Sequence, residues 1–269
     1  MKRLVTVALA AASLLVASAC NREVDASNRL SGTWKADTAS AQIEEQPSTY
    51  VLKDGVYSCP TCKPPLEVAA DGEFHPVPDR PYYDSMMVQV VDDRTVKYIR
   101  RKGDRTVEEG TMTLSPDGNT LTIAFVDSSV ANVPATEGQV AETRVGPAPE
   151  GAHPISGSWE TAGFSNFSDE ALTFAFDVNG DTVNMSSPSG VSYSAQVGGP
   201  AVPLEGDPAN TMVKIEMPDA NTLRETYSRD GKETSVATYT VGEDGKLQGV
   251  SENKVQGSVL RYSADKQGG

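Results

Sequence analysis

The short segment Cys59-Pro60-Thr61-Cys62 is the motif in this chain best suited to carry chemistry. Two thiols at this spacing can form a redox-active dithiol, half of a zinc site, or a disulfide that braces a turn. A redox pair needs a helix start to lower the thiol pKa, whereas the Lys-Pro-Pro sequence that follows favours extended chain. A zinc site needs two more ligands, and only His75 has a plausible spacing. We expect a structural pair that braces a turn, and the redox and zinc alternatives stay open.

No set of an acid, a base and a nucleophile, as catalysis would require, is visible in the sequence. The histidines are His75 and His153, and neither stands in a recognisable catalytic motif. We therefore predict that the chain is not an enzyme and that it needs no cofactor and no metal.

The part of the chain that must position these residues belongs to a sequence repeat. Ser31-Gly32-Thr33-Trp34 returns as Ser156-Gly157-Ser158-Trp159, and these are the two tryptophans of the 269 residues. The Asp-Gly pair at Asp117 returns at Asp244, so the offset is 159 − 34 = 125 residues early in the repeat and 244 − 117 = 127 later. A repeat of this length can bury its own core, which predicts two sibling domains. An alignment of Val56 with Val183 places Ser186 and Ser189 where the cysteines stand.

Each repeat has the pattern of short antiparallel strands. Apolar residues alternate with polar or small ones over 120–125 and 172–176, and Asp-Gly or Asn-Gly pairs supply the turns. The basic stretch 97–105 is interrupted by Ile99, which predicts a hairpin with a solvated outer face. The expected fold is all-β, with two tandem antiparallel barrels or barrel-like sandwiches of about eight strands each.

The N-terminus predicts export and a lipid anchor. Lys2 and Arg3 precede an uncharged run over 4–16, which is too short to span a bilayer, and small residues lead to Cys20. This arrangement resembles a bacterial lipobox, so we expect removal of the signal peptide and acylation of Cys20. Asn21 follows, and the absence of Asp at that position resembles sorting to the periplasmic side of the outer membrane.

The charge limits the partners. Lys and Arg number 23 against 37 Asp and Glu, a formal charge of −14, and loss of Lys2 and Arg3 gives 21 − 37 = −16. An acidic surface disfavours nucleic acid and anionic lipid headgroups, which require clustered basic side chains. The expected partners are the membrane, reached through the acyl chains on Cys20, and a small-molecule ligand.

A Pro- and Gly-rich segment separates the two repeats and sets the predicted domain boundaries. We expect a signal peptide over 1–19, the lipidated cysteine and a tether over 20–29, a first β domain over 30–146, a linker over 147–154 and a second β domain over 155–266.

Gly-x-Trp on an opening strand, an antiparallel body and a late arginine are similar to lipocalin-type barrels. The resemblance implies that a tryptophan plugs one end of each barrel under an arginine, with Trp34 paired to Arg144 and Trp159 to Arg261. The phrases Asp93-Arg94-Thr95-Val96 and 115–122 also resemble a module of uncharacterised bacterial secreted lipoproteins, which brings no known reaction.

Two function classes follow for such a chain. One is a non-enzymatic binding module for a small or apolar ligand, because eight-stranded barrels can enclose one. The other is a structural or partner-binding envelope lipoprotein with filled barrels.

Overall fold

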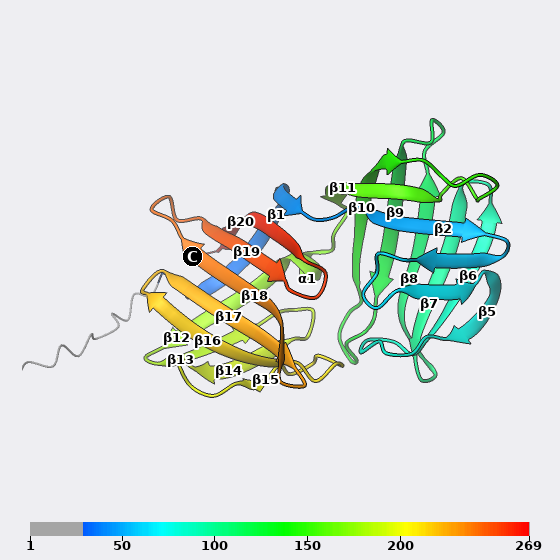
Figure 1. Cartoon of the computed structure of the whole chain (residues 1–269). Coiled ribbons are helices and arrows are strands. Elements are labelled where there is room, and N and C mark those ends of the chain that lie inside the picture. Colours follow the sequence, from blue (N-terminus) through cyan, green and yellow to red (C-terminus); the bar gives the residue numbers. More distant parts are fainter. Residues whose placement is uncertain (1–28, 269) are drawn as a thin grey trace, which may run out of the picture.

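The computed structural model describes residues 29–268, which form two nearly closed antiparallel barrels side by side (Figure 1). The prediction of an all-β chain with two tandem barrels is confirmed. Each sheet has ten strands, whereas about eight were expected. The difference arises because several strands are too short to be recognised in the sequence pattern. Cys20 and the expected signal peptide lie outside the described residues. Within the described part, no helix has the length and apolar character needed to cross a membrane.

The first barrel is a sheet in the order β4-β3-β2-β11-β10-β9-β8-β7-β6-β5. Its strands are β2 (Ser48–Lys53), β3 (Val56–Cys59), β4 (Leu66–Ala69), β5 (Asp71–Pro76), β6 (Ser85–Asp92), β7 (Thr95–Lys102), β8 (Arg105–Leu114), β9 (Thr120–Asp127), β10 (Thr136–Gly146) and β11 (Gly157–Ser165).

The second barrel is a sheet in the order β14-β13-β12-β1-β20-β19-β18-β17-β16-β15. Its strands are β1 (Gly32–Glu44), β12 (Thr173–Asn179), β13 (Thr182–Ser186), β14 (Ser192–Gln196), β15 (Val202–Pro203), β16 (Met212–Asp219), β17 (Thr222–Arg229), β18 (Lys232–Val241), β19 (Leu247–Asn253) and β20 (Ser258–Gln267). One short helix, α1 (Asp169–Leu172), precedes β12.

The two barrels exchange their opening strands. The N-terminal strand β1 pairs with β12 and β20, so in Figure 1 the blue strand lies in the barrel of the yellow and red strands. Strand β11 pairs with β10 and β2 in the first barrel. The expected division into 30–146 and 155–266 is therefore wrong for both opening strands, because each repeat completes the barrel of its sibling.

Tight turns and alternating apolar residues account for the strand pattern. Asp54-Gly55 and Asp230-Gly231 each have two consecutive positive φ angles, 52° and 75° in the first pair and 51° and 74° in the second. Such turns match the twist of a two-residue hairpin, and they join β2 to β3 and β17 to β18. Each barrel then encloses its own apolar core, with Trp159 in the first and Trp34 in the second.

Candidate functional site

The repeated Gly-x-Trp motif forms the same structure at the end of each barrel. Trp34 and Trp159 are fully buried, and each indole Nε1 donates to the backbone oxygen four residues earlier, at 2.8 Å to Leu30 and 3.1 Å to Ile155. Because a buried indole N–H needs an acceptor, this bond fixes the orientation of the ring. The motif thus places one fully buried, hydrogen-bonded indole in each core.

The cations over these rings differ from the predicted pairs. Arg144 lies 4.1 Å from the ring centre of Trp159, and Lys266 lies 5.3 Å from that of Trp34. Arg261 instead forms a 3.4 Å ion pair with Glu44 at the surface. The assignment of Arg144 to Trp34 is wrong because of the strand exchange. The assignment of Arg261 is wrong because the strand register places Lys266 opposite Trp34, as Arg144 is opposite Trp159.

Cys59 and Cys62 form a disulfide at the end of β3. Within this turn Thr61 accepts a hydrogen bond at 2.8 Å from the backbone N–H of Thr49, which ties the turn to β2. The sibling turn has no sulfur, and Ser187 donates to the backbone oxygen of Thr173 at 2.9 Å. The structural interpretation of the two cysteines is therefore the one that the fold supports.

The interior of the first barrel contains a cavity of about 270 Å³. Residues of seven strands line it, together with residues of the β3–β4 turn, the β5–β6 connection and the β19–β20 turn. These residues are Tyr50, Tyr57, Leu66, Tyr83, Met86, Tyr98, Met112 and Ile123 along the walls, with Cys62, Arg80, Arg100 and Gln256 also contributing. Apolar and aromatic walls with a few polar groups are typical of a small-molecule site.

Arg100 brings a positive charge to the wall of this cavity. It forms a 2.7 Å ion pair with Glu108, and its guanidinium lies 4.9 Å and 4.8 Å from the ring centres of Tyr83 and Tyr98. Tyr98 donates to the same Glu108 at 2.8 Å. Burial alone would lower the pKa of Arg100, but Glu108 and the tyrosines outweigh it and hold that pKa above its ordinary value. Burial also raises the pKa of Tyr98, so its hydroxyl remains a donor.

Glu142 is a second charged group of the first barrel and lies behind the cavity wall. Its side chain is buried, and Tyr50 donates to Oε1 at 3.2 Å. The other oxygen, Oε2, has no hydrogen-bond partner among residues 29–268. Burial raises the pKa of Glu142 from 4.5 to about 7, because the charged form loses its hydration.

The interior of the second barrel is built around Glu225 instead. This carboxyl is fully buried and accepts hydrogen bonds from the hydroxyls of Tyr193, at 2.5 Å, and of Tyr227. Burial raises the pKa of Glu225, although the tyrosine donors oppose the shift. A buried carboxyl held this way packs the barrel and leaves few groups for a ligand.

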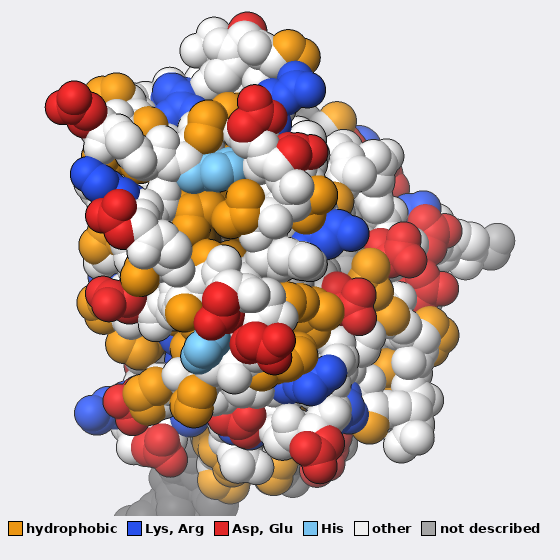
Figure 2. Space-filling model, turned by 90° about the vertical axis from the view of Figure 1, so that its right-hand side faces the viewer, with side chains coloured by type: hydrophobic (Ala, Val, Ile, Leu, Met, Phe, Trp, Pro, Cys, Tyr) orange, Lys and Arg blue, Asp and Glu red, His pale blue; other side chains and the backbone are white. Residues whose placement is uncertain are grey.

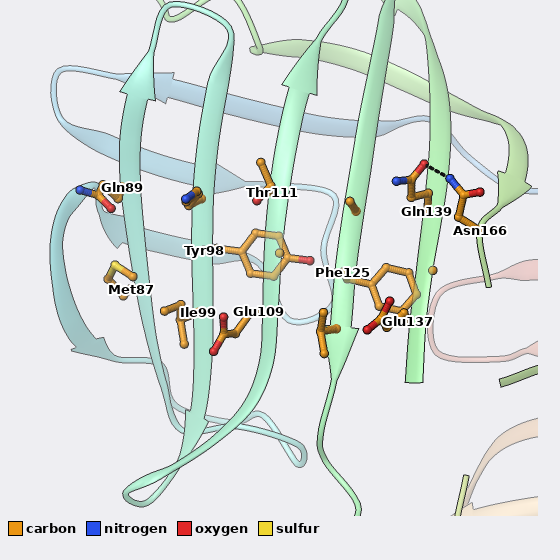
Figure 3. A pocket seen from close by; sticks show the side chains of 15 residues that line it. Met87, Gln89, Tyr98, Ile99, Glu109, Thr111, Phe125, Glu137, Gln139 and Asn166 are labelled. Atoms are coloured by element: carbon orange, nitrogen blue, oxygen red, sulfur yellow. Dashed lines mark hydrogen bonds between the residues drawn. The ribbon is translucent and has the colours of Figure 1, made fainter. Parts of the chain in front are cut away.

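A larger hollow, of about 520 Å³, lies on the outer face of β6–β10 (Figure 3). Buried Tyr98 borders both this hollow and the interior cavity, whereas Lys97, Glu109 and Glu137 are exposed to water. Gln139 and Asn166 bond to each other at 2.8 Å. We favour the smaller interior cavity as the candidate site because solvated surface charges require no ligand.

The histidines lie apart on the face of the first barrel shown in Figure 2, among interspersed acidic and basic side chains. His75 contacts Asp71 at 2.9 Å, and the ring of His153 contacts the backbone oxygen of Asp92 at 2.8 Å. In the described part of the chain, no three His, Cys, Asp or Glu side chains are grouped as metal ligands.

Sequence reasoning missed Arg100, Glu108, Glu142 and Glu225. A usable signal was the phase of the alternation: Arg100 follows Val96 and Tyr98, and Glu225 lies between Leu223 and Tyr227, each at an inward position. The stretch 97–105 does form most of a hairpin, but Arg100 points inward rather than to the solvated face. No family model, curated protein or solved structure matches the chain.

Proposed function

We propose that this protein is a lipid-anchored, non-enzymatic binding protein of the bacterial cell envelope, with a lipocalin-like barrel module. The first barrel takes up a small molecule, and the second supports it. The cavity of about 270 Å³ among tyrosine, methionine and leucine side chains is the observation that carries this proposal. The N-terminal signal and Cys20 support an anchor at the periplasmic face of the outer membrane.

The binding proposal is tested with a fluorescent probe and a matched pair of variants. Neutral phenylnaphthylamine brightens in apolar sites, and we expect saturable binding at one site per chain. Ile123→Trp fills the cavity and removes binding, whereas Ala124→Trp, which faces outward on the same strand, retains it. Ile123→Phe is a milder filling variant that reduces binding if the tryptophan variant does not fold. Absence of saturable binding, or equal binding by all variants, overturns the proposal.

The alternative is a structural or partner-binding lipoprotein with filled barrels, and the packing around Glu225 favours such a role for the second barrel. The anchor proposal has its own test. Cys20→Ala should release the folded protein from membranes in cell fractionation, and continued retention would contradict a lipid anchor.

A further inference from the structure

The cavity of the first barrel opens toward a groove between the two barrels. This groove has a volume of about 430 Å³ and shares Arg80, Tyr83 and Gln256 with the cavity. The first barrel contributes the β5–β6 connection, and the second contributes the end of β17 and the β19–β20 turn. A molecule in the cavity can therefore contact residues of both barrels where the cavity joins the groove.

Three cations line this groove in a chain of net charge −14. Lys63, Arg80 and Arg229 form no ion pair with any residue of 29–268. Their hydrogen bonds go to neutral acceptors: the backbone oxygen of Gln256 at 3.2 Å, that of Pro64 at 2.5 Å, and the Tyr82 hydroxyl at 2.9 Å. Asp79 is the acidic residue that lines the groove. The groove lining thus carries three cations against one anion.

Two arginine side chains, one in the groove and one in the cavity, each have a nitrogen donor without a partner. Nε of Arg229 in the groove and Nε of Arg100 in the cavity are buried and have no hydrogen-bond partner in the described part of the chain. A buried N–H without an acceptor is costly, so both arginines carry a donor that the fold itself leaves unsatisfied.

Aromatic rings lie beside these cations. The guanidinium of Arg229 is 5.1 Å from the ring centre of Tyr82, and that of Arg80 is 5.6 Å from the ring centre of Tyr83. Planar arginine and tyrosine surfaces suit a flat apolar body with a charged group at one end.

We propose that the groove between the barrels holds the charged group of an organic anion whose apolar body enters the cavity of the first barrel. This inference rests on the proposed binding function of the cavity and adds the ligand class. It also assigns the second barrel a direct part in binding, through Arg229 and Gln256.

Two dyes with the same aromatic body test the inference. Anilinonaphthalene sulfonate carries a negative charge, and phenylnaphthylamine is its neutral counterpart. We expect the anionic dye to bind about tenfold more tightly, because a charge-assisted contact contributes at least that factor. Arg80→Gln and Arg229→Gln should remove most of this preference. Arg229 lines the groove and not the cavity, so Arg229→Gln should also leave the affinity for the neutral dye unchanged. Arg94→Gln, at an exposed position outside the groove, is the control and should keep it.

The outcomes separate the two proposals. Equal affinity for both dyes, or an unchanged preference in the arginine variants, overturns the anion inference and leaves the cavity proposal standing. Failure of both dyes to bind overturns the cavity proposal itself. Lys63→Gln changes an exposed side chain and supplies the same test if an arginine variant does not fold.

Discussion

The interiors of the two barrels carry different ionisable groups at neighbouring inward positions of corresponding strands. Tyr98 and Arg100 of the first barrel correspond to Glu225 and Tyr227 of the second, with the same offset of 127 residues (225 − 98 and 227 − 100). The first barrel therefore has a guanidinium beside a cavity, whereas the second has a carboxyl covered by tyrosine hydroxyls. The same strand scheme thus holds a guanidinium in one barrel and a carboxyl in the other.

The plugged ends, in contrast, are nearly identical. Ser31 accepts the backbone N–H of Val178 at 3.0 Å, and Ser156 accepts that of Leu52 at 2.9 Å. In each case the acceptor comes from the other repeat. The repeats have kept the plug and changed the interior, which is the expected pattern if the plug provides stability and the interior provides function.

The largest expected effect tests which barrel each tryptophan supports. Trp34→Ala should destabilise the second barrel and Trp159→Ala the first, each by about 3–5 kcal/mol, because a large buried side chain is lost. Hydrogen exchange with mass spectrometry reads the two barrels separately. Loss of protection in residues 48–146 on changing Trp34 would contradict the strand exchange.

A second prediction concerns Glu142, whose counterpart by strand register is Ala264. The pKa of Glu142 is about 7 in the fold and 4.5 ordinarily, so the protonated form favours folding. This stabilisation is complete below about pH 4.5 and is lost as the pH rises through 7. Glu142→Gln should therefore gain up to about 3 kcal/mol over the wild type at pH 8, and little at pH 4. Urea unfolding at both pH values measures this, and an equal difference at both would show that titration plays no part.

Glycine before each tryptophan should differ in sensitivity. Gly32 and Gly157 both have positive φ, 136° and 145°, so alanine strains either by about 1–3 kcal/mol. A Cβ at Gly157 would lie 2.7 Å from the backbone oxygen of Gly146, whereas at Gly32 its close neighbours belong to the flexible Lys266 side chain. Gly157→Ala should therefore lower the melting temperature more than Gly32→Ala. The reverse order would show that the backbone contact relaxes easily.

The smallest effect is expected for the disulfide. Replacing Cys59 and Cys62 together by serine should cost no more than about 2 kcal/mol, since a short loop constrains little of the unfolded chain. The sibling turn forms with serine hydrogen bonds instead. Differential scanning calorimetry compares the variant with the wild type, and binding of the neutral dye should persist. Loss of the fold or of dye binding would show that the bridge shapes the cavity mouth.

The alternation and the turn pairs were sufficient to predict two antiparallel barrels. They could not reveal the exchange directly, because Trp34 and Trp159 would form the same contacts in either barrel. The cavity was less predictable, since its volume depends on side chains from seven strands that meet only in the closed sheet.

Exchange of β1 also sets the order in which the chain can assemble during synthesis. Its partners β12 and β20 begin at Thr173 and Ser258, so the first strand to emerge waits for almost the last. The first barrel waits likewise for β11, which follows nine of its strands in sequence. A chain interrupted near residue 150 completes neither barrel and keeps unpaired strand edges, which proteases and chaperones recognise. Only a chain that extends through β20 can therefore close both sheets, and a chain that ends near residue 150 does not form a folded domain.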